Sequence, residues 1–245
     1  MPPSPPPPPV PPGPAGSFCP SANDLIAGYG NPQIINRGWT VNAGGSVATK
    51  AAFNLLGGSV EYDVDFSGTK TGVNANIYTI SPANIGSYFN QGHYCDGAKY
   101  GNDWCVEVDW IETNGNCGGQ TTLHTVQGPG NDGCTAWGCA NSYHYNGKSK
   151  FHMKITYDAD GTWRTYRDGQ LIGPQHLSPQ PKSSDVAKLK EQYSQRGAVI
   201  YSSQWVGWVP VSDCGSNGDL NSSRFTISNL VIKGKVVQGP TPTKC

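Results

Sequence analysis

The sequence predicts an all-β domain, a sandwich, jelly roll or barrel, with at most one or two short helices. Apolar and polar residues alternate with period two along many short segments, which is the pattern of strands with one buried face. The 245 residues include 32 glycines and many Ser, Thr and Asn, which favour tight turns between strands. Only residues 183–195 (SSDVAKLKEQYSQ) have a helical pattern, with Ser183, Ser184 or Asp185 as the N-cap.

The strands predicted by this alternation follow one another at short spacing. Residues 158–161 (DADG) form a turn between two of them, and Asp168-Gly169 is a hairpin turn sequence. In chain order the predicted strands are SVEYDVDF (59–66), CVEVDWIETNG (105–115), FHMKITYD (151–158), TWRTYRDGQLI (162–172), AVIYSSQW (198–205) and FTISNLVIKGKVV (225–237).

The chain begins with a Pro-rich segment that we expect to lie outside the domain. Residues 2–14 are nearly all proline, which cannot donate to a strand ladder and adopts polyproline II. We predict a disordered Pro-rich linker over residues 1–18 and a single domain over residues 19–245, where the composition is even. No signal peptide is visible, so we expect that a leader was removed and a start Met added, or that the chain is a fragment.

The charge of the chain excludes two classes of partner. Charged residues are 14% of the sequence, the formal net charge is zero and there is no basic run. The sequence therefore has no electrostatic footprint for nucleic acid or for an anionic membrane surface. No apolar run approaches the ~18 residues of a membrane helix. We expect a monomer that binds neither nucleic acid nor membrane.

Eight cysteines in a Gly-rich chain suggest disulfides and a secreted or extracellular protein, with cell-wall association left open. None has the C-x-x-C spacing of a zinc site. The pairing cannot be deduced from the sequence, and some could instead be buried free thiols. Cys134 with Cys139, closing a small loop, and Cys19 with Cys245, tying the termini, are two candidate pairs. A glycosylation sequon at Asn221 indicates the same compartment.

The segment CVEVDWIETNG, residues 105–115, places three acids in an apolar run that is otherwise typical of a strand. Alternate side chains of a strand share a face, so Glu107 and Asp109 are expected on the face opposite the core. Plain alternation would send Glu112 inward. A β-bulge near Trp110-Ile111 would return Glu112 to the face of the other two acids. The side chains expected to point into the core are Val106, Val108 and Trp110.

Three carboxylates on one face suit acid–base catalysis. They cannot all ionise freely, so the pKa of one is raised, and that group can protonate a leaving group while an ionised neighbour attacks. The carboxyl groups of Glu107 and Glu112 could approach the ~5–5.5 Å separation of a retaining glycosidase. The alternatives are a calcium site, which needs six to eight oxygens that a strand supplies badly, and a solvated polar face, which would favour Thr, Lys and Ser. We favour catalysis.

The motif EVDWIE, residues 107–112, resembles the signature strand of the clan that joins family-16 and family-7 glycoside hydrolases. Four other stretches resemble these families in the same order, and together the matches cover most of residues 55–237. They are LLGGSVEYDVDFSGTKTGVNANIYTIS (55–81), TTLHTVQG (121–128), FHMKITYDADGTWRTYRDGQLI (151–172) and IYSSQW (200–205). The resemblance implies a β-jelly-roll sandwich of two antiparallel sheets with a concave substrate cleft.

The resemblance also implies roles for individual residues. Glu107 would be the nucleophile, Glu112 the acid/base, and Asp109 the residue that hydrogen-bonds and positions Glu107. The substrate-binding residues that it implies are His124, Trp205, Asn74 and Tyr78. Indoles stack on the apolar faces of pyranose rings, although any single Trp is more often a core residue. The further candidates on this ground are Trp104, Trp39, Trp137 and Trp208. No cofactor or metal is implied.

We therefore expect a secreted retaining endo-β-glucanase that acts by double displacement on a cell-wall or storage polysaccharide. Family-7 enzymes are far longer, so their tunnel-forming loops have no room here and an open cleft follows. Val106 stands where family 16 usually has Gly, so the linkage, β-1,4 or β-1,3(4), stays open. The alternatives are a transglycosylase on the same glucans, a non-catalytic carbohydrate-binding wall protein, and a jelly-roll polysaccharide lyase. The lyase ranks last because the acidic strand carries no Arg, Lys, His or Tyr.

Overall fold

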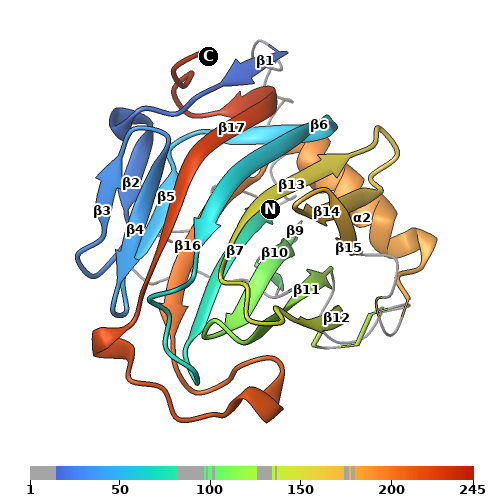
Figure 1. The fold of residues 1–245 in the computed structure, drawn as a ribbon. Helices are drawn as coiled ribbons and strands as arrows, with labels where there is room; N and C mark the ends of the chain where they lie inside the picture. The colour runs from blue at the N-terminus through green and yellow to red at the C-terminus, as the bar shows by residue number, and fades with distance from the viewer. Residues whose placement is uncertain are drawn as a thin grey trace, which may run out of the picture.

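Two antiparallel β-sheets stack on each other and make up most of the fold (Figure 1). The computed structural model describes residues 15–81, 97, 99–100, 103–125, 134–135, 137–173, 177 and 180–245. The seven-stranded sheet has the order β12 (Cys139–His144), β11 (Gly118–His124), β10 (Val106–Asn114), β7 (Asn74–Ser81), β16 (Val199–Trp205), β5 (Ser46–Thr49), β2 (Leu25–Ala27). The predicted all-β sandwich of two antiparallel sheets is confirmed.

The eight-stranded sheet lies nearer the viewer in Figure 1. Its order is β15 (Gln170–Gly173), β14 (Trp163–Arg167), β13 (Lys150–Tyr157), β6 (Ala52–Asp65), β17 (Arg224–Gln238), β4 (Gly38–Asn42), β3 (Gln33–Ile35), with β1 (Ala15–Phe18) also paired to β17. Separate from both sheets are the pair β8 (Lys99–Tyr100) and β9 (Asp103–Trp104) and the 3-10 turns η1 (Ala22–Asp24), η2 (Ser212–Cys214) and η3 (Leu220–Ser222). The hairpin predicted at Asp168-Gly169 joins β14 to β15, with both residues at positive φ.

The hydrophobic core fills the space between the two sheets. Tyr62 of β6 and Trp110 of β10 stack across it, with ring centroids 6.2 Å apart. Val106, Val108 and Trp110, predicted to point inward, belong to this core, as do the alternating apolar residues of β6 and β13. The period-two patterns of strands from both sheets therefore meet face to face, and each large side chain buried in this way contributes about 1.5–3 kcal/mol. The opposite face of β10 is left for its acids.

The helix α2 (Ser183–Gln195) has the bounds that the sequence predicts. It packs against β6 and β10. Its buried residues recur at helical spacing and are Asp185, Leu189, Gln192 and Tyr193. The N-cap is Lys182, so the prediction of Ser183, Ser184 or Asp185 as cap is wrong. Asp185 is instead the third helical residue, and its Oδ2 accepts the backbone N–H of Lys182 at 2.9 Å. In the described part of the chain, no helix is long and apolar enough to cross a membrane.

We expect Asp185→Ala to lower the free energy of unfolding by about 2–3 kcal/mol. The carboxylate of Asp185 is 3% exposed and also accepts the hydroxyl of Thr125 at 2.6 Å. The substitution leaves that buried hydroxyl and the first turn of α2 without their acceptor. Urea denaturation measures the change. Asp185→Asn keeps one acceptor oxygen and should lose less, while Glu191→Ala on the exposed side of the same helix should be near neutral. Equal stability of Asp185→Ala and the unaltered chain would contradict the expectation.

The domain begins earlier than the sequence predicts. The 4 residues of β1 (Ala15–Phe18) pair with β17, with Phe18 opposite Ile232. The linker predicted over residues 1–18 is therefore too long, and its last four residues belong to the fold. The Pro-rich residues 1–14 lie outside the described part of the chain.

Three disulfides are found among the described residues: Cys19–Cys245, Cys117–Cys214 and Cys134–Cys139. The first and last are the two candidate pairs from the sequence, and both are confirmed. Cys19–Cys245 lies beside the pairing of β1 with β17, so two ties hold the ends of the domain together. Cys95 lies outside the described residues.

Candidate active site

A β-bulge in β10 determines which side of the sheet each acid faces. The register with β7 shifts between Asp109 and Ile111, and the register with β11 shifts between Asp109 and Glu112. Consecutive residues Trp110 and Ile111 consequently both lie in the core. The extra residue returns Glu112 to the side opposite the core, and the bulge predicted near Trp110-Ile111 is confirmed.

The partners of the acids on β11 establish that all three share one face. The opposed pairs are Glu107–His124, Asp109–Thr122 and Glu112–Gln120. These partners are every second residue of β11 and so project to the same side of the sheet. We call this side the acid face: the face of the seven-stranded sheet, opposite the core, that carries Glu107, Asp109 and Glu112.

The acids are nearly closed to solvent and lie within a polar cluster. Glu107 is 4% exposed, Asp109 2% and Glu112 8%. His124 Nε2 lies 3.2 Å from Asp109 Oδ2. One ligand-type atom from each of Glu107, Asp109 and His124 lies within 4.8 Å of the others. Such burial is stable only when the carboxylates have polar partners, which the acid face provides.

Glu112 has a defined set of partners. Its Oε2 accepts from Gln120 Nε2 at 3.0 Å and from Thr122 Oγ1 at 3.1 Å, and its Oε1 accepts from Asn74 Nδ2 at 3.2 Å. Burial raises the pKa of Glu112 above its usual value, the charge of Glu107 raises it further, and His124 and the amide hydrogen bonds lower it. A raised pKa favours a protonated carboxyl group, which is the form that a general acid needs.

Strand β7 supplies two of the predicted binding residues. Asn74 is fully buried and donates to Glu112, as described above. Tyr78 lies opposite Asp109, and its ring centroid is 5.1 Å from that of Tyr201 on β16. Burial, followed by the charge of Glu107, holds the pKa of Tyr78 well above its usual value, so its phenol stays protonated. The structure therefore brings His124, Asn74 and Tyr78 to the acids.

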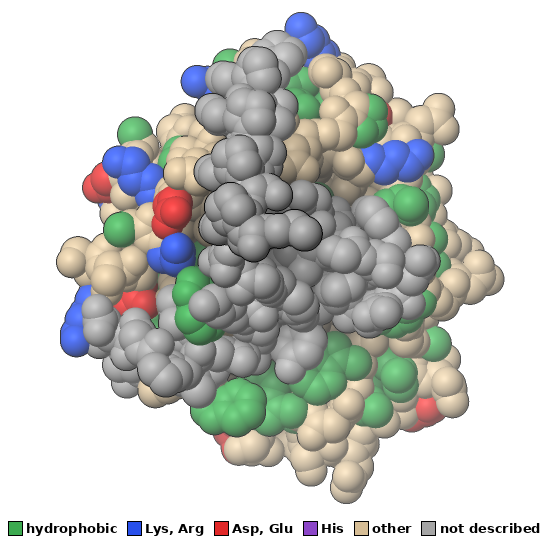
Figure 2. All heavy atoms as spheres, turned by 180° about the vertical axis from the view of Figure 1, so that it is seen from behind, with side chains coloured by type: hydrophobic (Ala, Val, Ile, Leu, Met, Phe, Trp, Pro, Cys, Tyr) green, Lys and Arg blue, Asp and Glu red, His purple; other side chains and the backbone are tan. Residues whose placement is uncertain are grey.

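The tryptophans named from the sequence lie in different environments. Trp205 is half-buried opposite Asn74 on β7, and it stacks on Trp208 with ring centroids 6.3 Å apart. Trp104 is half-buried on β9, outside the sheet that carries the acids, so its role in binding stays a prediction. Trp39 is fully buried in the core and is wrong as a binding candidate. Figure 2, which shows the molecule from behind, has a group of hydrophobic side chains in the lower part of that face.

Gln120 and Thr122 are site residues that the sequence prediction missed. Both hydrogen-bond to the carboxylate of Glu112, and Ser142 Oγ donates to Gln120 Oε1 at 3.2 Å, which orients its amide toward Glu112. The pattern that could have revealed them is period two, because both alternate with His124 along one strand. A strand predicted to place His124 beside the acids must place these two residues there as well.

Two groups of side chains among the described residues have the spacing of metal ligands. One is Glu107, Asp109 and His124. In this group His124 Nε2 lies 3.2 Å from Asp109 Oδ2, so the two side chains form an ion pair when His124 is protonated. The other is Cys117, Cys214 and His144, where both sulfurs are already joined in a disulfide.

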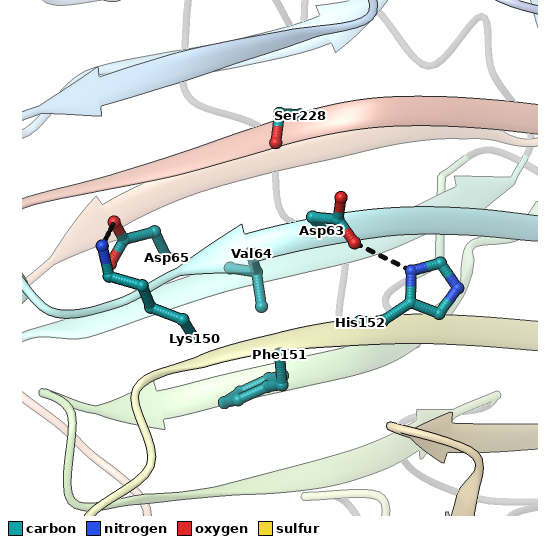
Figure 3. A pocket seen from close by; sticks show the side chains of 7 residues that line it. All are labelled: Asp63, Val64, Asp65, Lys150, Phe151, His152 and Ser228. Carbon is teal, nitrogen blue, oxygen red and sulfur yellow. Dashed lines mark hydrogen bonds and ion pairs between the residues drawn. The ribbon is translucent and has the colours of Figure 1, made fainter.

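A polar hollow on the eight-stranded sheet is separate from the acid face. It lies over β6, β13 and β17 and has a volume of about 390 Å³ (Figure 3). Its charged side chains pair with one another: Asp63 Oδ1 lies 2.8 Å from His152 Nδ1, and Asp65 Oδ2 lies 2.8 Å from Lys150 Nζ. A hydrogen bond from Asn229 lowers the pKa of Asp63, and one from Lys150 lowers the pKa of Asp65 despite its partial burial. The hollow therefore holds no carboxylate of raised pKa. The hollow is therefore a poor candidate for acid catalysis.

No family model and no curated protein matches the chain. Solved structures do match it. The endo-β-1,3-glucanase of Pyrococcus furiosus is 15% identical with a TM-score of 0.52, over 86% of this chain and 79% of that one. A family-7 cellobiohydrolase of Daphnia pulex is 14% identical with a TM-score of 0.52, over 81% and 79%. A Crh5 transglycosylase is 12% identical with a TM-score of 0.52, over 96% and 90%. The chain has the β-jelly-roll fold of these enzymes.

The jelly-roll fold explains how residues far apart in the sequence reach one face. Asn74, Glu112, Gln120 and Trp205 come from β7, β10, β11 and β16, which are neighbours in the seven-stranded sheet. Among these strands only β16 is reached by way of the eight-stranded sheet, through β13, β14 and β15, so Trp205 joins the site only when both sheets have formed. The predicted jelly-roll class is confirmed, as is the resemblance in fold to the clan of family-16 and family-7 enzymes.

We expect Gln120→Leu to raise the pKa of Glu112 further. The amide of Gln120 stabilises the ionised carboxylate, and a leucine of similar size removes that hydrogen bond without admitting water. The measurement is a ¹³C-NMR titration of the glutamate side-chain carboxyl groups. Gln170→Leu, on the exposed hairpin between β14 and β15, is the control and should leave the titration unchanged. A downward shift for Gln120→Leu would contradict the assignment of this partner.

Proposed function

We propose that the chain is a secreted retaining endo-β-glucanase. The observation that carries the proposal is the bulge in β10, which puts Glu107 and Glu112 on one wall, both nearly buried, with the pKa of Glu112 raised. Two glutamates in different electrostatic environments are what a double displacement requires. The fold likeness to glucanases and three disulfides support the substrate class and the secretion respectively.

The proposed reaction has two steps. In the first, a carboxylate oxygen of Glu107 attacks the anomeric carbon, the glycosidic C–O bond breaks, and Glu112 gives its proton to the departing sugar oxygen. In the second, Glu112 takes a proton from water, the water oxygen attacks the anomeric carbon, and the ester to Glu107 breaks. Asp109, held beside His124, positions Glu107. Each step inverts the anomeric carbon, so the product keeps the β configuration.

The test is reducing-end release from a panel of cellulose, laminarin, lichenan and xyloglucan, with the anomeric configuration followed by NMR. We expect early release of internal fragments with β reducing ends from at least one glucan. Inversion of configuration would contradict the mechanism. No release from any glucan, together with binding that is the same for the unaltered chain and Glu107→Gln, would favour a non-catalytic carbohydrate-binding wall protein instead.

A transglycosylase is the second candidate. The likeness to a Crh5 transglycosylase covers 96% of this chain, and the proposed chemistry differs only in the last step, where a sugar hydroxyl replaces water. Product analysis with an added acceptor oligosaccharide separates the two candidates. Products longer than the starting glucan would favour transfer, and products that are only shorter would favour hydrolysis.

A further inference from the structure

A disulfide-closed loop displays the most exposed large apolar side chain among the described residues. Trp137 is 78% exposed. Cys134 and Cys139 are bonded to each other and both lie in the hydrophobic core, so both ends of the loop are anchored. Thr135 Oγ1 donates to the carbonyl of Gly138 at 3.0 Å and accepts the backbone N–H of Trp137 at 3.1 Å. The side chain of Thr135 therefore ties the backbone of Trp137 and Gly138 to the start of the loop.

This loop packs directly on the acid face. A Cβ atom at Gly138 would lie 2.8 Å from Nδ1 of His124 and 2.7 Å from Cγ2 of Thr122. His124 lies opposite Glu107 in the sheet, and Thr122 hydrogen-bonds to Glu112. Residue 138 must be glycine for the loop to approach so closely, since φ there is also +85°. The backbone next to Trp137 thus touches the side chains that touch the acids.

An indole as exposed as that of Trp137 would gain free energy by contact with a ligand that has an apolar face. Tryptophan is highly buried on average, and a large aromatic side chain held in water on a rigid loop loses the free energy of burial. The C–H faces of pyranose rings supply such a surface, and an indole covers one at low entropic cost. Because Gly138 packs on His124 and Thr122 of β11, a glucan chain reaching Glu107 across β11 would pass beside this loop.

We propose that Trp137 is a stacking platform for the glucan chain on the β11–β12 side of the acids. The inference rests on the proposed function and adds a chain-length requirement to it. Strands β12 and β16 are four inter-strand spacings apart, about 19 Å, with β10 between them. Trp137 lies just before β12, and the stacked Trp205 and Trp208 lie at the end of β16. Only an oligosaccharide of several units spans both sides, so the platform selects polymers over disaccharides.

The experiment measures binding by calorimetry in the Glu107→Gln chain, which keeps the sugars intact. The probes are the hexasaccharides and disaccharides of β-1,3- and β-1,4-linked glucose. Adding Trp137→Ala should weaken hexasaccharide binding roughly tenfold and leave disaccharide binding within about twofold. Trp137→Tyr, which keeps an aromatic face, should recover most of the affinity. Ile35→Ala, which removes an exposed apolar side chain from β3 of the eight-stranded sheet, is the control and should change the affinity for neither probe.

The outcomes separate this inference from the proposed function. Equal hexasaccharide affinity with and without Trp137, or no binding of any probe, overturns the platform. A loss confined to the hexasaccharide supports it, whether or not the unaltered chain hydrolyses glucan. Failure to hydrolyse any glucan, with that selective loss still observed, overturns the hydrolase alone. Thermal unfolding of each variant confirms that an exposed side chain was changed without loss of the fold.

Discussion

Glu107→Gln is expected to slow glucan hydrolysis by at least about a thousandfold. An amide oxygen in place of the carboxylate cannot form the ester to the anomeric carbon, while the near-identical shape preserves the buried cluster around it. Initial rates of reducing-end release measure the loss. Glu191→Gln, on the exposed side of α2, where Glu191 pairs with Lys188, is the matched control and should keep full activity.

A stereochemical readout assigns the role of Glu107 independently of the rate. In Glu107→Ala the space left by the side chain admits azide, which should attack the anomeric carbon directly and give the α-glycosyl azide from an activated aryl β-glucoside. A single displacement inverts the centre, so this product follows only if Glu107 is the nucleophile. A β-glycosyl azide from this variant would show that the roles of Glu107 and Glu112 have been exchanged.

Glu112→Gln should slow hydrolysis of natural glucan by about a hundredfold to ten-thousandfold, because both the acid and the base are lost. An aryl glucoside with a good leaving group needs no proton, so its first step should survive. The ester to Glu107 should then accumulate and appear as a burst of aryl alcohol, because water is no longer deprotonated. Stopped-flow absorbance measures the burst.

Two further observations check this role of Glu112. Azide should rescue Glu112→Ala through the intact ester and give the β-glycosyl azide, the opposite anomer to that from Glu107→Ala. The alkaline limb of the pH–rate profile should also disappear, because that limb reports loss of the proton from Glu112, whose pKa is raised by burial. Persistence of the limb in Glu112→Gln would mean that another group is the acid.

The bulge and the helix could be predicted because local rules decide them. In β10, plain alternation would have buried the charge of Glu112 among apolar side chains, and one inserted residue removes that cost. In α2, the periodic residues that end at Gln195 define its length without help from the rest of the chain. The cap was missed because Asp185, three residues into the helix, satisfies the backbone of Lys182 from inside and leaves the cap position open to any residue.

Other features depend on contacts that no local pattern encodes. Cys117 and Cys214 are separated by 97 residues and meet only after the sheets have formed. The strand Ala15–Phe18 has too few residues to show alternation, and its pairing with β17 holds it in the domain. Trp39 was predicted as a binding candidate because it is a tryptophan, and the residue type does not show which way the side chain points. In the structure it points into the core.

The bulge can be removed without changing which side of the sheet each acid faces. Losing one codon at Trp110 or Ile111 would leave one residue opposite Thr121, and plain alternation would then keep Glu112 opposite Gln120 on the acid face. What would be lost is the local bend and added twist that a bulge gives to its strand, and with it the aim of the Glu112 side chain. Such a deletion should therefore leave the sheets paired while displacing the acid, so a folded but inactive descendant of this gene can arise through strand length as well as through exchange of side chains.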